Sequence, residues 1–206
     1  MTSAGSLDVV TGGMFSGKSE ELIRQLKRAV IAKKSIMVFK PVIDNRYSHE
    51  MVVSHSRQEI PACPWNQNDP LGILYNNSEW HQAQKDYNPF VTVEWSWNAD
   101  VIGIDEAQFF GSDIITVVDT LVDMGKRVIV AGLDLDFRGE PFGSMPILMA
   151  KADHITHLTA ICTVCGQPAI RTQRLDASSD ESVVIGGDDK YAARCRQHFT
   201  PGPKST

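Results

Sequence analysis

Residues 9–26, VVTGGMFSGKSEELIRQL, join a short apolar run to an amphipathic segment through a glycine-rich turn. Gly12 and Gly17 enclose four residues, and Lys18 and Ser19 follow them, which gives the spacing G-x-x-x-x-G-K-S. The glycines allow backbone N–H groups to surround an anion, and the N-terminus of the following helix adds partial positive charge. A glycine turn before an ordinary helix is the alternative, which the order strand, loop, helix disfavours. The segment therefore predicts a binding site for the phosphates of a nucleoside triphosphate.

The residues after this turn predict how the site works. Leu22, Ile23 and Leu26 fall on one face of a helix with its usual period, so this face is expected to be buried. We expect Lys18 to reach the β- and γ-phosphates of ATP and Ser19 to bind Mg²⁺. The predicted ATP-binding residues of the loop are Gly12, Gly13, Met14, Phe15, Ser16, Gly17, Lys18 and Ser19.

Size and charge limit the classes of protein to consider. The chain has 206 residues, 42% of them hydrophobic, which is enough to bury a core in one domain with or without an appendage. Its formal net charge of −5 disfavours a protein that coats nucleic acid, because such proteins carry a basic surface. The first residues lack the features of a secretory signal, and no apolar run is long enough to span a membrane. We therefore expect a cytoplasmic protein that binds neither nucleic acid nor a membrane.

Three further apolar runs predict buried strands: residues 35–39, 101–105 and 127–134. Residues 113–125 have the periodicity of an amphipathic helix that ends at Gly125. Apolar strands that alternate with helices are typical of an α/β fold, in which helices cover both faces of a parallel sheet. Ligands of such sheets bind beyond the carboxyl ends of the strands. We expect the glycine loop, Asp44, Asp105 and Asp134 to face one crevice there.

Two carboxylates directly follow the predicted strand in VIGIDEAQFF, residues 101–110. In enzymes with this kind of glycine loop, an aspartate at the position of Asp105 holds Mg²⁺. Glu106 could accept a proton from an attacking hydroxyl group, or it could be a solvated carboxylate or a second contact to metal-bound water. The residues alone favour neither role. As an aromatic pair, Phe109 and Phe110 are expected in the core.

The two segments between the strands at 35–39 and 101–105 are less regular. Residues 42–62 alternate polar and apolar side chains, which predicts a hairpin or an extended loop. Residues 63–98 have no clear period and contain all four tryptophans; a helix near residues 79–85 is the only element predicted there. Cys63 has no partner in the sequence and is expected to be a buried or free thiol.

Four residues near the C-terminus have the spacing of metal ligands. Cys162 and Cys165 form a C-x-x-C pair, and Cys195 and His198 form a C-x-x-H pair. Two such pairs predict a closed, tetrahedral zinc site; a redox pair and simple buried cysteines are the alternatives. Zinc would hold together the ends of residues 166–194, which we expect to act as a lid over the nucleotide site.

Six blocks of the sequence, in order, resemble the type II thymidine kinases, a family that includes the cytosolic animal enzyme and many bacterial enzymes. The blocks are GGMFSGKSEELIR, VFKPVIDNRYS, VIGIDEAQFF, VIVAGLDLDFRGEPFG, LTAICTVCGQPAIRTQRL and VVIGGDDKYAARCRQHF. The resemblance covers nearly everything except residues 61–98, a stretch that looks longer than the family's usual connection. Leu135 stands where relatives often have a polar or small residue.

The resemblance implies a RecA-like α/β domain over residues 1–158, a small zinc-binding domain with a lasso loop over residues 159–200, and a flexible tail over residues 201–206. It also implies transfer of the γ-phosphoryl group of ATP to the 5′-hydroxyl of thymidine or deoxyuridine, in pyrimidine salvage. ATP as phosphate donor, Mg²⁺ and a structural Zn²⁺ are the implied cofactors, and a homotetramer is the implied assembly.

Roles for individual carboxylates follow from the same resemblance. Glu106 would be the general base, and Asp105 would support the metal. Asp44 and Arg46 would lie near the metal and the phosphates, and Gln108 is grouped with the ATP-binding residues.

A nucleoside pocket is also implied by the resemblance. Its residues would be Met14, Phe109, Leu133, Phe137, Phe142, Thr172, Val184, Ile185, Gly186 and Tyr191. This implication moves Phe109 from the core to the pocket, whereas Phe110 stays in the core.

Overall fold

A computed structural model of the chain describes residues 4–44, 50–75, 98–175 and 189–202. Its centre is a six-stranded sheet in the order β5-β2-β6-β7-β1-β8, and every pair of neighbouring strands is parallel. The strands are β1 (Ser6–Thr11), β2 (Ile36–Pro41), β5 (Cys63–Trp65), β6 (Val101–Ile104), β7 (Arg127–Gly132) and β8 (His154–His157). The predicted α/β fold with a parallel sheet is confirmed.

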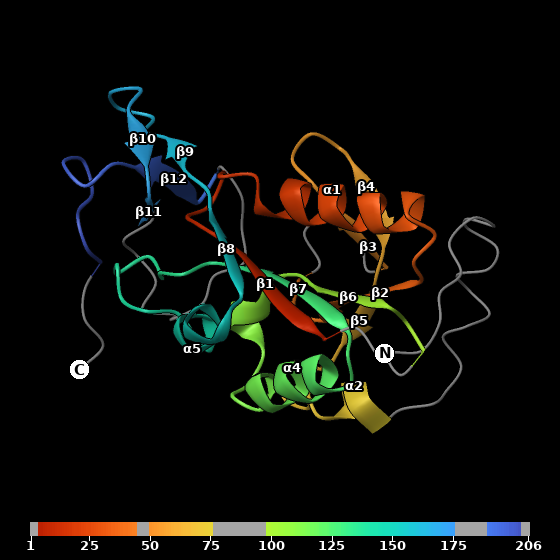
Figure 1. Ribbon diagram of the computed structural model, residues 1–206. Helices are drawn as coiled ribbons and strands as arrows, with labels where there is room; N and C mark the ends of the chain where they lie inside the picture. The colour runs from red at the N-terminus through yellow and green to blue at the C-terminus, as the bar shows by residue number, and fades with distance from the viewer. Residues whose placement is uncertain (1–3, 45–49, 76–97, 176–188, 203–206) are drawn as a thin grey trace.

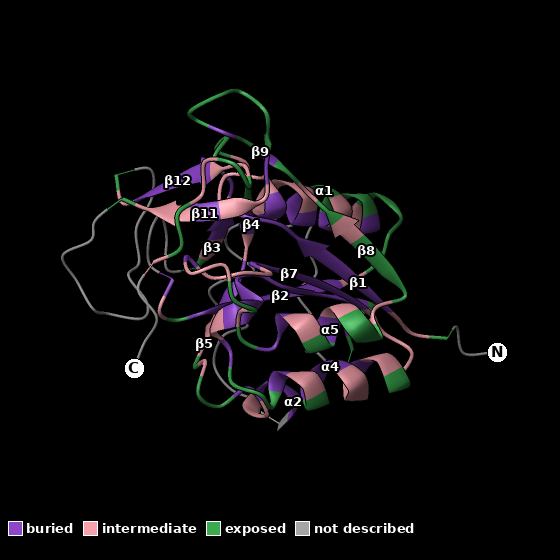
Figure 2. Ribbon diagram, turned by 90° about the vertical axis from the view of Figure 1, so that its left-hand side faces the viewer, coloured by how far each residue is buried: buried purple, intermediate pink, exposed green. Residues whose placement is uncertain are grey.

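Helices cover both faces of this sheet (Figure 1). One face carries α1 (Lys18–Ile31), and the other carries α2 (Gly72–Tyr75), α4 (Ile114–Asp123) and α5 (Met145–Lys151). The helix predicted over residues 113–125 is α4, and Gly125 follows its end with a φ of 81°, a left-handed conformation that suits glycine. Figure 2 shows the buried strands as a purple layer between the helices.

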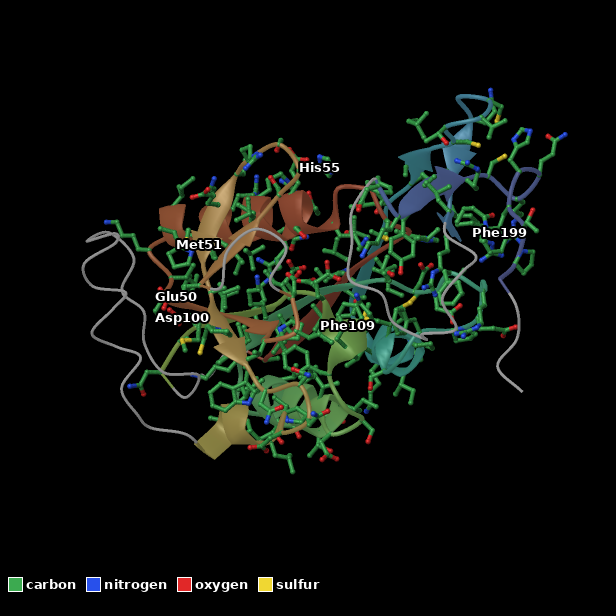
Figure 3. All side chains as sticks on the ribbon, turned by 180° about the vertical axis from the view of Figure 1, so that it is seen from behind. Glu50, Met51, His55, Asp100, Phe109 and Phe199 are labelled. Carbon is green, nitrogen blue, oxygen red and sulfur yellow. The ribbon has the colours of Figure 1, made fainter. Side chains whose placement is uncertain are left out.

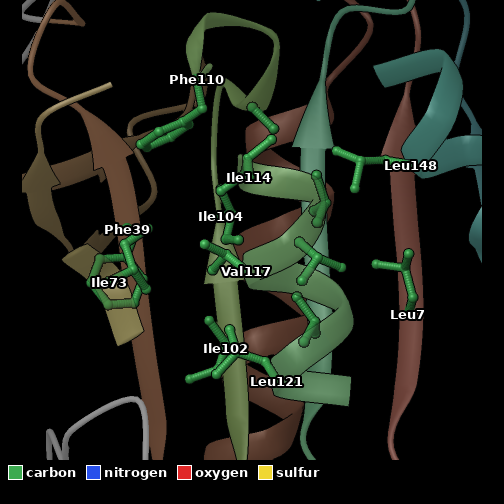
Figure 4. Close-up of a cluster of buried hydrophobic side chains, with 14 of the residues drawn as sticks. Leu7, Phe39, Ile73, Ile102, Ile104, Phe110, Ile114, Val117, Leu121 and Leu148 are labelled. Atoms are coloured by element: carbon green, nitrogen blue, oxygen red, sulfur yellow. The ribbon is translucent and has the colours of Figure 1, made fainter. Parts of the chain in front are cut away.

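Two clusters of buried apolar side chains hold these layers together, one on each face of the sheet. Leu22 and Leu26 of α1 are fully buried in one cluster, on the helix face that the sequence predicts. In the other cluster, Leu121 of α4 lies beside Ile102 of β6, and Val117 lies beside Ile104 (Figure 4). Every residue of β2 and β6 is buried, because these central strands lie between two helical layers.

The chain between β2 and β6 contains a hairpin and a further strand of the sheet. β3 (Met51–Val53) and β4 (Glu59–Pro61) pair antiparallel, which confirms the hairpin predicted within residues 42–62. β5 and α2 lie where the sequence predicts no element, because three and four residues are too few to show a period. The helix predicted near residues 79–85 lies outside the described residues, as do Trp80, Trp95 and Trp97.

Cys63 and Trp65 belong to β5, at the edge of the sheet. The ring of Trp65 meets that of Phe39 edge to face, with centroids 6.0 Å apart, and its Nε1 donates to the carbonyl oxygen of Asp69. Cys63 is a buried, free thiol, as expected, and burial raises its pKa to about 12. This thiol therefore stays protonated and unreactive at neutral pH.

After β8, the chain forms two small antiparallel sheets separate from the central one. β9 (Ala160–Ile161) pairs with β10 (Pro168–Ala169), and β11 (Arg171–Arg174) pairs with β12 (Tyr191–Arg194). We call this part, residues 160–198, the zinc segment. Its buried residues form a small core of their own, and Phe15 of the glycine loop packs against that core. The zinc segment therefore lies beside the loop between β1 and α1 (Figure 1).

The predicted domain boundary at residue 158 falls between β8 and β9, and it stays a prediction. In the predicted tail, Gly202 lies so close to Phe137 that a Cβ there would be 2.8 Å from the ring. Of the loop over residues 166–194 that is predicted to act as a lid, residues 176–188 lie outside the described residues. No helix in the described ranges combines the length and the apolar character needed to cross a membrane.

Candidate functional site

The glycine loop begins where β1 ends, and a steric contact explains why its first residue is glycine. Gly12 has a φ of 143°, and a Cβ there would lie 2.3 Å from the carbonyl oxygen of Leu158, so no other residue fits. Gly17, with a φ of 86°, is the N-cap of α1. The chain thus turns sharply from the strand into the helix, and the first N–H groups of α1 point toward the loop.

Side chains of the loop hold it in one shape. Phe15 has a φ of 64°, a conformation that costs a residue other than glycine about 1–3 kcal/mol. The hydroxyl of Ser16 and the Nζ of Lys18 both donate to the carbonyl oxygen of Gly13, each at 2.8 Å. Lys18 is buried, so its cation lies over the loop rather than in solvent. This arrangement can bind an anion with little reorganisation.

Asp105 lies at the end of β6, next to the start of α1. Its Oδ2 accepts a hydrogen bond from the hydroxyl of Ser19 at 3.1 Å, and its backbone N–H donates to Phe39 of β2. A hydroxyl and a carboxylate in contact are the oxygen ligands that Mg²⁺ prefers. The two residues predicted to support the metal are therefore together, and their chemistry fits that ion.

Glu106 is buried and has an unusual backbone conformation. Its φ of 50° and ψ of 42° are left-handed, and it precedes the short 3₁₀ helix η1 (Ala107–Phe109). Its Oε2 accepts a hydrogen bond from Nε2 of Gln108 at 2.5 Å. The Oε1 of Gln108 accepts from the backbone N–H of Leu133, at the end of β7, at 2.9 Å. Gln108, grouped by the resemblance with the ATP-binding residues, thus lies between Glu106 and Leu133.

Asp44 and Asp134 follow two other strands of the sheet. Asp44 is buried, and its Oδ2 lies 3.2 Å from Nζ of Lys40, a lysine in the otherwise apolar strand β2. The Oδ2 of Asp134 lies 3.1 Å from Nε2 of His157, at the end of β8. Since all the strands are parallel, both carboxylates lie at the same edge as the glycine loop and Asp105. Lys40 and His157 have no motif, and sequence reasoning missed both.

Several residues of the predicted nucleoside pocket contact one another. The rings of Phe109 and Phe142 meet edge to face, with centroids 5.6 Å apart. Figure 3 shows Phe109 near the middle of the molecule and Phe199 beside the zinc segment. Leu133 is linked to this pair indirectly. Its backbone N–H donates to Gln108, and Gln108 is in the same 3₁₀ helix as Phe109. Phe110 is buried in the core, as expected.

Phe137 and Tyr191, which are also predicted to line the pocket, are both buried. The guanidinium groups of Arg138 and Arg174 lie 4.4 and 5.0 Å from the centroid of the Phe137 ring. Tyr191 pairs with Arg174 across β11 and β12. A pocket role for these two residues stays a prediction. The remaining predicted residues, Arg46, Val184, Ile185 and Gly186, lie outside the described residues.

Thr172 joins the zinc segment to the glycine loop. Its buried Oγ1 accepts a hydrogen bond from the backbone N–H of Met14 at 3.0 Å, and both residues are predicted to contact the nucleoside. This contact ties β11 to the phosphate loop, although the two residues are 158 positions apart in the chain.

We expect Thr172→Val to weaken ATP binding in the absence of nucleoside, by about 0.5–1.5 kcal/mol, because the partly buried N–H of Met14 loses its acceptor. Isothermal titration with a non-hydrolysable ATP analogue measures this. Thr172→Ser keeps the oxygen and is the matched control, with affinity close to that of the parent protein. A loss in Thr172→Ser as large as that in Thr172→Val would contradict the role of the hydroxyl, because serine keeps it.

The four predicted metal ligands come together in the zinc segment. The ligand atoms of Cys162, Cys165, Cys195 and His198 all lie within 4.8 Å of one another. The two sulfurs of Cys165 and Cys195 are 3.8 Å apart, and the sulfur of Cys195 is 3.3 Å from Nδ1 of His198. A tetrahedral zinc ion with bonds of about 2.3 Å to sulfur requires a sulfur–sulfur separation of about 3.8 Å. The cluster therefore has the dimensions of a zinc site.

The charge state of Cys162 also suits a metal. Desolvation alone would raise the pKa of Cys162, but backbone N–H groups, that of Cys195 above all, lower it to about 5. The thiolate is the form of cysteine that binds zinc. Four ligands leave no place for a substrate, which favours a structural role for the ion.

Removal of zinc with a chelator should lower the Tm by about 5–10 °C, because the loop ends joined at the cluster come apart. Metal analysis and thermal melting, with and without chelator, measure this. Cys165→Ser, at an exposed ligand, should lose the metal, whereas Cys63→Ala, at the cysteine outside the cluster, should keep it. Protein without zinc, or a Tm that the chelator does not change, would contradict the assignment.

Comparison with known proteins connects this arrangement to a family. The sequence matches the family described as "Thymidine kinase" over residues 5–199. Among solved structures, the flagellar accessory protein FlaH from Methanocaldococcus jannaschii is 14% identical, over 79% of this chain and 74% of that chain, with a TM-score of 0.43. A likeness at that level carries no argument about this protein. The family match is different, because it includes the glycine loop, both carboxylates after β6 and the four residues of the Cys/His cluster: the chain belongs to the thymidine kinase family.

Proposed function

We propose that this protein transfers the γ-phosphoryl group of ATP to the 5′-hydroxyl of thymidine or deoxyuridine, giving the 5′-monophosphate in pyrimidine salvage. Membership of the family makes it a nucleoside kinase in general terms. The observation that carries the finer proposal is the pair of carboxylates after β6. Asp105 accepts a hydrogen bond from Ser19, directly after the phosphate loop, whereas its neighbour Glu106 accepts one from Gln108. One carboxylate can thus serve the metal and the other the acceptor.

The phosphate side of the proposed site uses the glycine loop. Its backbone N–H groups and Lys18 would bind the phosphates, and Ser19 and Asp105 would hold Mg²⁺. The ion supplies charge neutralisation when it is bound. Phosphoryl transfer depends mainly on position and electrostatics, so a preformed loop with a buried lysine suits this chemistry. Asp44, held by Lys40, would complete the acidic side of the site.

The acceptor side uses Glu106 and the residues around η1. Glu106 would take the proton of the 5′-hydroxyl as the nucleoside attacks. Phe109, Phe142 and Leu133 would form apolar walls for the base, with Met14 and Thr172 on the side of the zinc segment. Apolar walls can accept the thymine methyl group, although one carbon is worth only about 1–3 kcal/mol of discrimination. Deoxyuridine is therefore expected as a second substrate.

The test is ADP release from Mg-ATP by the purified protein with thymidine, deoxyuridine, deoxycytidine, deoxyadenosine and deoxyguanosine. Release with only the first two supports both the reaction and the pocket. Release with purines or deoxycytidine would keep the kinase but overturn the pocket. No release with any nucleoside, but stimulation by DNA, would instead indicate an ATPase that acts on nucleic acid.

The assembly and the location belong to the same proposal: the homotetramer rests on the resemblance, and the location rests on the sequence features described above. We propose a cytoplasmic homotetramer. Size-exclusion chromatography with light scattering measures the number of subunits.

A further inference from the structure

Gln108 is one of the most buried polar residues of the described chain, with an exposed fraction of 3%. Both ends of its side-chain amide are hydrogen-bonded: Nε2 donates to Oε2 of Glu106, and Oε1 accepts from the backbone N–H of Leu133. The two partners follow different strands: Glu106 comes after β6, and Leu133 comes after β7. The amide therefore bridges the carboxyl ends of two neighbouring strands.

The backbone of Leu133 fixes the direction of this bridge. A backbone N–H group can only donate a hydrogen bond, so the oxygen of the Gln108 amide must face Leu133. The NH₂ group must then face Glu106, where it can only donate. Glu106 is consequently the acceptor in this pair. The amide therefore links one of its carboxylate oxygens to the end of β7.

Two glycines make room for Gln108. A Cβ on Gly132 would lie 2.8 Å from Oε1 of Gln108, and a Cβ on Gly143 would lie 2.3 Å from its carbonyl oxygen. Gly143 also has a φ of 54°, which suits glycine. Both the amide and the main chain of Gln108 thus occupy a socket that side chains at these positions would fill.

The socket connects the two halves of the acceptor side. Glu106 and Phe109 stand on the same short turn as Gln108, and Phe109 packs against Phe142. Leu133 is held at the other end of the amide. A shift of Gln108 would therefore change the spacing between the carboxylate and the apolar residues predicted to hold the base.

We propose that Gln108 is a positioning residue that holds the carboxylate of Glu106 at a fixed place relative to the nucleoside. This inference rests on the proposed function, in which Glu106 accepts the hydroxyl proton. It also differs from the contact with ATP that the resemblance implies for Gln108. In this proposal the amide acts through Glu106 and Leu133 and not on the phosphates.

Two substitutions separate the two hydrogen bonds. Gln108→Met has a similar shape and removes both bonds, whereas Gln108→Glu keeps an acceptor for Leu133 but turns an oxygen toward Glu106. We expect either variant to lower kcat by about 10²-fold, the usual cost of a misplaced catalytic group. The KM for ATP and the affinity for an ATP analogue should stay within about two-fold, because the phosphate loop is untouched.

Gln25 offers a matched control on α1. Its Nε2 donates to Glu21 at 2.9 Å, and its Oε1 accepts from Arg127 at 2.7 Å. Both ends of its amide are therefore bonded too, but at the start of β7, the opposite end of the strand from Leu133. Gln25→Met and Gln25→Glu should keep the kcat of the parent protein. Equal losses of kcat in the Gln25 variants would overturn the inference, because the effect would then be one of stability.

A double variant supplies a readout that does not depend on activity. In Glu106→Gln/Gln108→Glu, the amide and the carboxylate exchange places, so the bond re-forms and Leu133 keeps an acceptor. The double variant should recover most of the Tm lost by Gln108→Glu while remaining inactive. A Tm that is not recovered would contradict the contact, even if Gln108→Met failed to fold.

The single variant Glu106→Gln separates this inference from the proposed function. Loss of turnover in Glu106→Gln with unchanged kcat in both Gln108 variants would overturn the positioning role alone. A rise in the KM for ATP in the Gln108 variants would restore the implied ATP contact and would also overturn it. Normal turnover in Glu106→Gln would instead remove the general base and, with it, the proposed function.

Discussion

Replacement of Glu106 by glutamine is expected to lower kcat by about 10²–10⁴-fold, the usual contribution of a general base. The side chain keeps its size, so the buried site should not collapse. The new amide can still present its oxygen to Nε2 of Gln108 and keep that hydrogen bond. What is lost is the ability to accept the hydroxyl proton. Steady-state kinetics with thymidine and Mg-ATP measure the change.

The binding of ATP is the second measurement on Glu106→Gln. The carboxylate next to the phosphate loop is that of Asp105, which the variant leaves in place, so the affinity for an ATP analogue should hardly change. Glu59→Gln, an exposed glutamate on β4, is the matched control and should keep full turnover. Unchanged turnover in Glu106→Gln would exclude Glu106 as the base and leave it as a structural carboxylate.

Several features of the fold are predictable because their signals are local. The glycine loop needs only the spacing of Gly12, Gly17 and Lys18, and the zinc cluster needs only two pairs of ligands. The buried strands β2, β6 and β7 and the helices α1 and α4 carry long apolar patterns. Each signal falls within a few turns or one strand, so no knowledge of distant contacts is required.

Other features depend on contacts that the sequence does not display. The bond between Thr172 and Met14 joins residues 158 positions apart, and the bond from Leu133 to Gln108 spans 25. The residue types do not indicate these long-range hydrogen bonds, because glutamine and threonine are both common on protein surfaces. The lysine in β2 is a partial exception, because a charge within an apolar strand suggests a buried partner.

The surroundings of Phe137 show the same limit. An aromatic residue near the end of a strand can line a ligand site or pack against the protein. The structure gives this ring two guanidinium partners and the nearby Gly202, which come from three separate parts of the chain. A pattern of residue types cannot distinguish these environments, because ring size and polarity are the same in both.

Replacement of Lys18 by alanine should lower kcat/KM by about 10³-fold, as loss of a preorganised charge on the transferred group does. In the parent protein, the Nζ of Lys18 is buried and held 2.8 Å from the carbonyl oxygen of Gly13. No other residue of the loop supplies a cation, since Gly12–Ser19 contains one basic side chain. The moving phosphoryl group would therefore lose its fixed positive partner. Initial rates at substrate concentrations well below KM measure kcat/KM directly.

Lys27→Ala is the matched control for this experiment. Lys27 is on the same helix, but its Nζ lies on the exposed side, 3.4 Å from Gln58. Its removal changes the net charge equally and should leave kcat/KM close to that of the parent protein. Normal kcat/KM in Lys18→Ala would contradict the assignment of the loop to phosphate.

The affinity for ATP distinguishes the Lys18 variant from the Glu106 variant. Lys18 would contact the phosphates both in the bound substrate and in the transition state, so its loss should weaken ATP binding as well as turnover. Glu106 would act only as the hydroxyl attacks, so its loss should change turnover alone. Lys18 begins α1 directly after the glycine loop, and Glu106 follows β6. If both variants weakened ATP binding equally, Glu106 would belong to the phosphate site, and the acceptor side would need another base.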